Sequence, residues 1–293
     1  MLYRWRLDRL PDSAENRSLF GQPNRASPFG ATRCRSAVLV LRSSSTVNLP
    51  IYMDNASTTR TDPRVVEAML PFFTETYGNS ASRNHAFGWA AEAGVDRARE
   101  QAASLIGAGP KEIVWTSGAT ESNNLAIKGA AQMYAKAPMG EQGRGHIITC
   151  IIEHKAVLDP CKRLEREGFD VTYLEPGSDG IVTADLVRAA MRDDTILVTI
   201  MWANNETGVI QPIEEIVRLS QPFDTFVHTD AIQACGKVNL DWGILGVDAL
   251  SLSAHKIGGP QGVGALILNK KFDLDARFFG GGQERSFRPG TEN

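Results

Sequence analysis

A lysine in an unusual position gives the first indication of chemistry in this sequence. Lys256 follows the apolar run Ala249–Ser253 and precedes the glycine-rich stretch Ile257–Gly264, although lysine is normally a surface residue. Burial lowers the pKa of an amine, and a neutral amine is a nucleophile toward carbonyl groups. The position therefore predicts covalent chemistry between Lys256 and an aldehyde or ketone.

A carboxylate stands at the end of a second apolar run. Asp230 follows Thr225–Thr229 directly, and Gln233 lies three residues further along the chain. An ionised carboxylate that is buried at a strand end is unfavourable without a partner. A protonated ring nitrogen of a ligand is one such partner, and a buried arginine or lysine is the alternative.

Small polar residues connect a third apolar run to a predicted helix. The stretch Ser117–Ser122 follows Glu112–Thr116 and includes Ala119 and Thr120. Small side chains let the backbone approach a ligand, and the first turn of a helix offers unpaired N–H groups at the positive end of the helix dipole. The pattern favours phosphate binding, with an ordinary serine or threonine helix cap as the alternative.

Two further polar residues follow apolar runs. His154 comes soon after His146–Cys150, and its imidazole could stack on a planar ligand, shuttle protons or simply begin a helix. Asn205 lies in Trp202–Gly208, whose amides could orient a polar ligand or form a turn. Each of these patterns taken alone has an ordinary structural explanation.

Taken together, the candidates supply an amine for an aldehyde, a carboxylate for a pyridinium, an imidazole that can stack and a phosphate-binding turn. Pyridoxal phosphate requires these parts, including a Schiff-base lysine and an acidic partner for its ring nitrogen. A nicotinamide coenzyme is the competing interpretation. It would need the pattern Gly-x-Gly-x-x-Gly between a strand and a helix, with an acid about 20 residues later. The sequence has no match in that context.

The candidates stand at the ends of predicted strands that alternate with predicted helices. Short apolar strands separated by helices indicate an α/β fold with a mostly parallel sheet and helices on both faces, and ligands in such sheets bind at the carboxyl ends of the strands. The predicted strands are Glu112–Thr116, His146–Cys150, Val171–Leu174, Ile196–Met201, Thr225–Thr229, Ala249–Ser253 and Gly264–Leu268. The predicted helices are Pro63–Phe73, Phe87–Ile106, Ser122–Tyr134, Lys155–Glu167, Thr183–Met191 and Pro212–Leu219.

Composition narrows the class of protein. The 293 residues are 42% hydrophobic and 22% charged, as in an ordinary globular protein, and the formal net charge of -3 argues against a nucleic-acid-binding surface. No apolar run approaches the roughly 20 residues that span a bilayer, so no membrane partner is expected. Four cysteines are too few for a disulfide scaffold and lack the spacing of a zinc site, which predicts free thiols, a reducing compartment and no metal site. They are Cys34, Cys150, Cys161 and Cys235.

Residues 1–50 differ in composition from the rest of the chain. They hold eight arginines, no lysine and three acids, which leaves 23 basic and 31 acidic residues, a net charge of -8, in residues 51–293. An arginine-rich, serine-rich segment is typical of an organelle transit peptide. A disordered extension, or sequence translated upstream of the true start, is the alternative. We therefore expect a leader over residues 1–50 that lies outside the folded domain.

The chain from Ile51 to Asn293 resembles the cysteine desulfurases, class-V-aminotransferase-like enzymes that depend on pyridoxal phosphate and serve iron–sulfur cluster assembly. The strings that carry the resemblance are YMDNASTTRTDPRV, YGNSASRNHAFGW, EIVWTSGATESNNLAIKG, EHKAVLDPCKRLEREGF, ANNETGVIQPI, HTDAIQACGK, SLSAHKIGGPQGVGAL and GGGQERSFRPGTEN. The resemblance implies the fold type I of pyridoxal-phosphate-dependent transferases. It also implies that residues 51–293 comprise the large, cofactor-binding domain and the first segment of a C-terminal small domain that is otherwise largely missing.

The resemblance implies a role for each residue around the cofactor ring. Lys256 would bind pyridoxal phosphate covalently, His154 would stack on the ring and assist proton transfer, and Asp230 would pair with the ring nitrogen. Gln233 and Asn205 would lie near the ring hydroxyl and the substrate.

A second set of roles concerns the cofactor phosphate. By the resemblance, Ala119, Thr120, Ser253 and His255 would hold it. Thr291 would reach the phosphate of the neighbouring subunit, which implies a homodimer.

The implied reaction takes sulfur from L-cysteine and releases L-alanine. A cysteine thiolate of the enzyme accepts the sulfur as a persulfide and passes it to iron–sulfur scaffold and sulfur-carrier proteins. In the family this cysteine lies downstream of the segment matching GGGQERSFRPGTEN, and none of the four cysteines here matches it. We therefore expect cofactor binding, but no completed sulfur transfer, from this chain.

Several functions and locations remain open from the sequence. A selenocysteine lyase or another class V aminotransferase-type enzyme would share these residues, and so would a non-catalytic short form that pairs with a full-length subunit. A nicotinamide-dependent oxidoreductase is the remaining alternative. The similarity to bacterial members favours a cytoplasmic location, whereas a genuine transit peptide would indicate the mitochondrial matrix.

Overall fold

The computed structural model describes residues 50–141 and 143–293. The chain divides into two units after Ile51, and Tyr52–Asn293 is the compact unit described below. Cys34 and the predicted leader, apart from Pro50, lie outside the described residues, so the expectations for them stay predictions.

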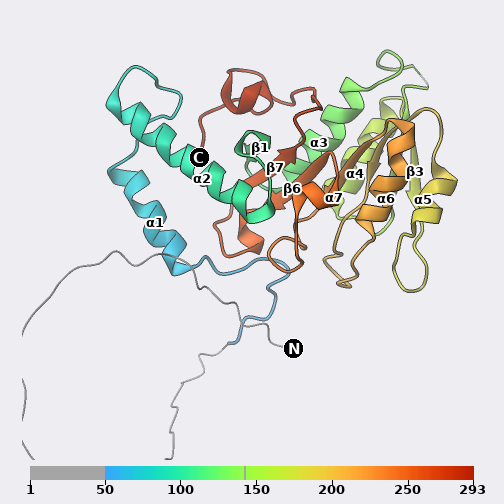
Figure 1. Ribbon diagram of the computed structural model, residues 1–293, viewed down its shortest axis with the longest axis horizontal. Coiled ribbons are helices and arrows are strands. Elements are labelled where there is room, and N and C mark those ends of the chain that lie inside the picture. Colours follow the sequence, from blue (N-terminus) through green and yellow to red (C-terminus); the bar gives the residue numbers. More distant parts are fainter. Residues whose placement is uncertain (1–49, 142) are drawn as a thin grey trace, which may run out of the picture. The chain divides into compact units, whose positions relative to one another are not determined.

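Seven strands form one mixed, mostly parallel sheet (Figure 1). They are β1 (Ile113–Thr116), β2 (His146–Cys150), β3 (Asp170–Leu174), β4 (Thr195–Thr199), β5 (Phe226–Asp230), β6 (Ala249–Ser253) and β7 (Gly264–Leu268). Their order across the sheet is β1-β7-β6-β5-β4-β2-β3. All seven predicted strands are present: three have the predicted ends, and the ends of the other four differ from prediction by at most two residues.

The direction of one strand was not predicted. β7 runs antiparallel to both β1 and β6, whereas the remaining pairs are parallel. A parallel crossover needs a dozen or more residues and usually a helix. The short connection over 254–263, between β6 and β7, has no such helix, so the chain returns beside β6 in the opposite direction.

The helices alternate with the strands along most of the chain, as the sequence predicts. They are α1 (Pro63–Thr74), α2 (Ala86–Ile106), α3 (Ala119–Met133), α4 (Lys155–Arg166), α5 (Ala184–Ala190), α6 (Ile213–Ser220) and α7 (Trp242–Leu245), with 3₁₀ turns at Pro110–Glu112, Gln221–Phe223, Ala254–Lys256 and Gln283–Ser286. The first six match predicted helices, and the short α7 was missed. α3 begins three residues earlier than predicted, which brings Ala119 and Thr120 into its first turn.

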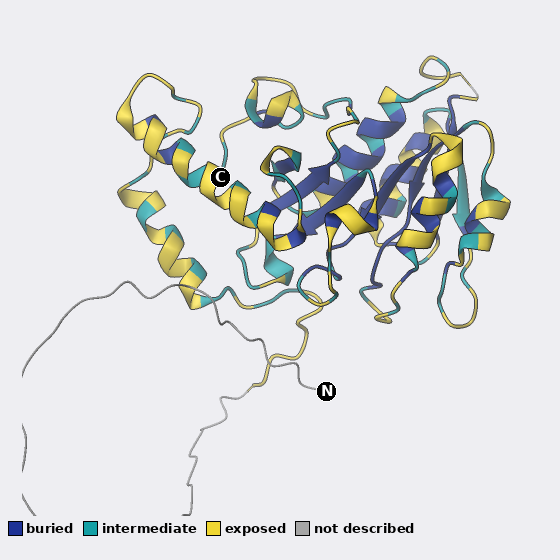
Figure 2. Cartoon of the chain, viewed as in Figure 1, coloured by how far each residue is buried: buried dark blue, intermediate teal, exposed yellow. Residues whose placement is uncertain are grey.

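Helices cover both faces of the sheet, as predicted. One buried apolar cluster joins α3 and α4 to one face, and a second joins the end of α2 with α5, α6 and α7 to the other. Adjacent strand residues divide between them: Ile147 belongs to the first cluster and Ile148 to the second, because side chains alternate across a strand. Figure 2 shows the strands other than β3 as mostly buried.

Apolar side chains on α1 and α2 are exposed. No residue of α1 is buried, and Leu70 and Phe73 expose 58% and 68% of their surface. Phe87 and Trp89 at the start of α2 are each 56% exposed. Exposed apolar surface of this kind favours association between molecules, so it predicts poor solubility.

Other features of the described residues bear on function. No helix there combines the length and apolar character required to cross a membrane. The residues contain no cluster of three or more metal-ligating side chains. Cys150, Cys161 and Cys235 are free and buried.

A histidine inside the sheet makes the stability of the fold pH-dependent. The His228 ring on β5 bonds Thr199 Oγ1 on β4 (2.8 Å) and Ser251 Oγ on β6 (2.9 Å). Burial lowers the pKa of His228 from 6.5 to about 3. Between these values the unfolded chain binds a proton at this site that the folded chain does not, so His228 lowers the free energy of unfolding as pH falls.

Replacing His228 removes this pH dependence. We expect His228→Gln to be less stable than the parent at pH 7, because one of two buried hydrogen bonds is lost. Between pH 6.5 and 3 its free energy of unfolding should fall less steeply than that of the parent. Urea unfolding at several pH values measures both slopes, and equal slopes would contradict the assignment.

Candidate functional site

The carboxyl end of β5 carries a buried carboxylate. Asp230 is the last residue of β5 and is 6% exposed. Its Oδ2 accepts a hydrogen bond from Asn123 Nδ2 of α3 (2.8 Å), and its Oδ1 accepts one from the Ile232 N–H (3.0 Å). Burial raises the pKa of Asp230, although these two donors and the nearby side chains of His154 and Lys256 counteract the rise. The carboxylate therefore has donors but no bonded cation among the described residues, and it lies close to two other predicted site residues.

Lys256 lies at the end of the neighbouring strand, in the 3₁₀ turn that follows β6. Its Nζ donates hydrogen bonds to the carbonyl oxygens of Ala56 (2.5 Å) and Ser57 (2.7 Å). Burial lowers the pKa of Lys256 below its usual value, while the charges of Asp230 and Asp54 oppose the change. The direction is the one that favours a nucleophilic amine.

A turn near the start of the described chain brings Lys256 and Gln233 together. Gln233 Nε2 donates to the same Ala56 carbonyl that accepts from Lys256 (2.7 Å). The turn is held in place by His255, whose carbonyl accepts from the Thr59 N–H (2.8 Å) and whose Nδ1 bonds Thr58 Oγ1 (3.0 Å). Sequence reasoning assigned no role to Ala56, Thr58 or Thr59. Their string YMDNASTTRTDPRV was the available signal.

His154 and Asn205 each combine a structural position with an accessible side chain. His154 caps α4 through its Nδ1, which accepts from the Ala156 N–H (3.0 Å), and the residue is exposed at the end of β2. The turn at 204–207 is held by Asn204, whose Oδ1 accepts from the Glu206 N–H (2.9 Å). Asn205 instead lines a pocket of 580 Å³ together with Gln233. The helix-start interpretation of His154 is thus correct, and it leaves the ring available.

The phosphate-binding turn predicted before α3 lies beside the end of β6. Ser253 is 3% exposed, and its Oγ is buried without a hydrogen-bond partner among the described residues. A methyl group added to Gly118, the N-cap of α3, would stand 4.0 Å from this hydroxyl. A buried hydroxyl next to the unpaired N–H groups of a helix start is the arrangement that an anionic ligand would satisfy.

A glycine contact sets the spacing of this turn. A methyl group added to Gly264, at the start of β7, would lie 2.5 Å from the Cα of Gly118. We expect Gly264→Ala to destabilise the fold by about 1–3 kcal/mol through overpacking, and to displace the turn before α3. The matched control is Gly282→Ala, because Gly282 has a φ of -106° and open space around it. Equal free energies of unfolding for the two variants would contradict the expectation.

Thr291 stands apart from the other candidates. It is exposed, and no hydrogen bond joins it to them among the described residues. Its neighbour Glu292 accepts a hydrogen bond from Ser80 Oγ (2.5 Å). The structure therefore brings together the candidates around Lys256, Asp230 and the start of α3, and leaves Thr291 outside that group.

Comparison with known proteins identifies the family of this chain. The family sequence model described as aminotransferase class-V matches residues 51–290. The chain belongs to the class-V aminotransferase family. The cysteine desulfurase IscS of Anaeromyxobacter dehalogenans (strain 2CP-C) is 56% identical over 250 residues, covering 84% of this chain and 60% of that protein. IscS of Vibrio vulnificus (strain YJ016) is 56% identical over 249 residues, with the same shares.

Solved structures agree with the class-V aminotransferase assignment. A NifS-like protein superposes with a TM-score of 0.78 at 43% identity, covering 83% of this chain and 65% of the other. SspA in complex with cysteine gives a TM-score of 0.78 at 42% identity, covering 82% and 68%. DndA from Streptomyces lividans gives 0.70 at 46%, covering 82% and 67%. The fold is the predicted fold type I of pyridoxal-phosphate-dependent transferases.

The class-V aminotransferases are pyridoxal-phosphate-dependent, and the residues present fit that group. The unpartnered Ser253 hydroxyl beside the start of α3 suits a phosphate, Asp230 suits a ring nitrogen, and Lys256 suits an aldehyde. The chain spans 60% of the length of the IscS relatives that it matches.

Proposed function

We propose that this chain is the cofactor-binding part of a cysteine desulfurase. The observation that carries the proposal is the convergence at one sheet edge of the Lys256 amine, the buried Asp230 carboxylate and the unpartnered Ser253 hydroxyl. Relatives named cysteine desulfurase IscS, at 52–56% identity, support this specific activity.

The proposed roles around the ring follow from the contacts. Lys256 would bind pyridoxal phosphate covalently. Its Nζ would then give up its hydrogen bonds to the two backbone carbonyl oxygens, those of Ala56 and Ser57. Asp230, held by Asn123 and the Ile232 N–H, would keep a proton on the ring nitrogen. His154 would stack on the ring, where its exposed imidazole can take or return a proton.

The remaining roles concern the substrate and the phosphate. Asn205 and Gln233 would orient polar groups in the pocket that they share. The Ala119 N–H, Thr120, Ser253 and His255 would hold the phosphate at the first turn of α3. When bound, the cofactor supplies an electron sink for the carbanion at the substrate α-carbon.

Sulfur transfer requires a further group. Burial raises the pKa of Cys150 and of Cys235 to about 11, and that of Cys161 to about 12. Because the thiolate is the nucleophilic form, these three cysteines are unsuited to attack the sulfur of L-cysteine. We therefore propose that the described part of the chain binds pyridoxal phosphate but does not by itself complete the transfer.

The proposed setting is that of the cysteine desulfurases. The substrate is L-cysteine, the product is L-alanine, and the sulfur passes to iron–sulfur scaffold and sulfur-carrier proteins. Two copies form a homodimer in which Thr291 reaches the phosphate of the other copy. Bacterial IscS relatives support a cytoplasmic location.

A titration of the 293-residue chain with pyridoxal phosphate tests the proposal. The visible absorbance of a covalently bound cofactor should appear, and L-cysteine should change that spectrum without leaving a persulfide on the protein. Absence of bound cofactor would overturn the cofactor assignment. A persulfide that depends on L-cysteine and is located on Cys150, Cys161 or Cys235 would overturn the statement about these three thiols.

A further inference from the structure

An ion pair stands directly beside the proposed phosphate site. Glu121 follows Thr120 in the first turn of α3, and its Oε1 accepts a hydrogen bond from Arg288 Nε (2.8 Å). Its Oε2 accepts one from the Ser117 N–H (2.7 Å). The side chains of Glu121 and Arg288 are only 12% and 26% exposed. One carboxylate thus links the turn before α3 to the C-terminal part of the chain.

The charge of Glu121 matters to any phosphate bound at this turn. Burial raises the pKa of its carboxyl, but the hydrogen bonds from Arg288 and Ser117 outweigh burial and hold the pKa below its usual value. An ionised carboxylate in the first turn of α3 would repel a phosphate dianion if it stood alone. The guanidinium of Arg288 cancels that charge.

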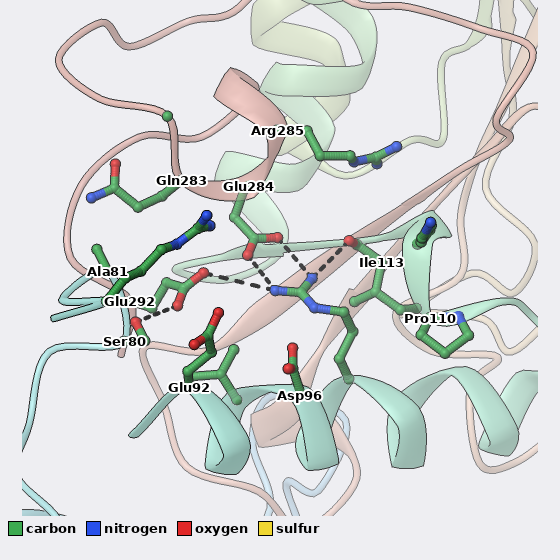
Figure 3. A pocket seen from close by; sticks show the side chains of 15 residues that line it. Ser80, Ala81, Glu92, Asp96, Pro110, Ile113, Gln283, Glu284, Arg285 and Glu292 are labelled. Atoms are coloured by element: carbon green, nitrogen blue, oxygen red, sulfur yellow. Dashed lines mark hydrogen bonds and ion pairs between the residues drawn. The ribbon is translucent and has the colours of Figure 1, made fainter. Parts of the chain in front are cut away.

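The segment that carries Arg288 is anchored separately. Glu284, four residues earlier, accepts hydrogen bonds from both terminal nitrogens of Arg99 on α2 (2.5 and 3.0 Å) and from the Trp115 N–H on β1 (2.6 Å). Glu284, Arg285 and Ser286 all have left-handed φ angles of 47°, 57° and 67°. Non-glycine residues in the left-handed region are strained. The bonds between Arg99 and Glu284 hold the turn in this conformation (Figure 3). The anchored turn directs the chain back toward α3.

We propose that Glu121 and Arg288 are positioning residues for the cofactor phosphate. Glu121 holds the Ser117 backbone so that the N–H groups at the start of α3 face the phosphate, and Arg288 prevents the Glu121 charge from repelling it. The inference rests on the proposed function, because it presumes pyridoxal phosphate at this turn.

The chain offers a matched control for the loss of positive charge. Arg277 lines the same pocket of 460 Å³ as Arg288 and Glu121. It pairs with Asp275 (3.5 Å), and within the described part of the chain no hydrogen bond or ion pair joins it to Glu121. Arg277→Gln therefore removes one positive charge near the site without freeing the Glu121 carboxylate.

The test compares two ligands on four variants of the whole chain. Dissociation constants for pyridoxal phosphate and for pyridoxal, which lacks the phosphate, are measured by absorbance. Arg288→Gln should weaken pyridoxal phosphate binding on the order of tenfold and leave pyridoxal binding unchanged. Glu121→Gln keeps an acceptor for Ser117 and should bind at least as tightly as the parent. The double variant should recover most of the affinity, and Arg277→Gln should have the smallest effect.

The results separate this inference from the proposed function. If Arg288→Gln binds pyridoxal phosphate as the parent does, or if the double variant is weaker than Arg288→Gln, the positioning role is wrong. Equal weakening of pyridoxal binding would assign Arg288 a general structural role and would also overturn the inference. If the parent chain itself binds no pyridoxal phosphate, the proposed function fails instead.

Discussion

Replacing Lys256 with alanine is expected to abolish covalent attachment of pyridoxal phosphate to this chain. The amine combines a pKa lowered mainly by burial with a position between the Asp230 carboxylate and the turn at Ala56 and Ser57. A neutral amine held there can attack the aldehyde, and alanine offers no nucleophile. Reduction of the adduct with borohydride followed by intact-mass measurement should show one cofactor on the parent chain and none on the variant.

Lys237 provides the control for this prediction. Its Nζ donates to Gln233 Oε1 (2.6 Å), so it lies at the edge of the same site. Burial lowers its pKa, and the charge of Lys256 lowers it further. Lys237 is therefore the best competing amine, and Lys237→Ala should retain the adduct. If Lys256→Ala carries as much adduct as the parent chain, or if only Lys237→Ala loses the adduct, the assignment of the reactive amine to Lys256 is wrong.

Replacing Arg99 with alanine is expected to cost about 3–5 kcal/mol of the free energy of unfolding, the range for breaking one side of a buried ion pair. The Glu284 side chain is 1% exposed, and Arg99 binds it through two nitrogens while also donating to the Ile113 carbonyl (2.9 Å). Without Arg99 the Glu284 carboxylate would keep the hydrogen bond from the Trp115 N–H but lose its counter-charge. Urea unfolding measures the difference.

Two further variants distinguish a buried charge from a simple loss of packing. Arg97 lies on the same helix and is exposed, so Arg97→Ala should change the free energy of unfolding by less than about 0.5 kcal/mol. Arg99→Met with Glu284→Gln removes both charges and keeps an acceptor for Trp115, and it should recover most of the loss. If the double variant is as unstable as Arg99→Ala, burial of an unpaired charge is not the cause.

Sequence patterns were sufficient to predict the helices and strands and to select most residues of the candidate site. The alternation of apolar runs with amphipathic segments is local in the chain, so it predicted all seven strands and six of the helices. Because parallel strands end at the same edge of a sheet, the sequence alone predicts that the residues after those runs lie close together. Asp230, Lys256 and Gln233 do meet there.

Contacts between distant parts of the chain were not predictable in this way. Glu284 and Arg99 are 185 residues apart, Arg288 and Glu121 are 167 apart, and Lys256 and Ala56 are 200 apart. No periodicity relates such pairs, because each depends on how helices pack around the finished sheet. The reversal of β7 belongs to the same class, since it follows from a short connection and the space left beside β6.

The sequence by itself therefore determined the α/β elements, the strand-end residues and the class of cofactor that they suit, because these depend on local pattern and residue chemistry. The tertiary structure alone decided which groups surround each candidate. It placed the Ala56 and Ser57 carbonyls on Lys256, left the Ser253 hydroxyl without a hydrogen-bond partner in the described part of the chain, and joined Glu121 to Arg288. Those contacts arise from packing between segments far apart in the chain, where electrostatics and burial act on distance in space and not on spacing in sequence.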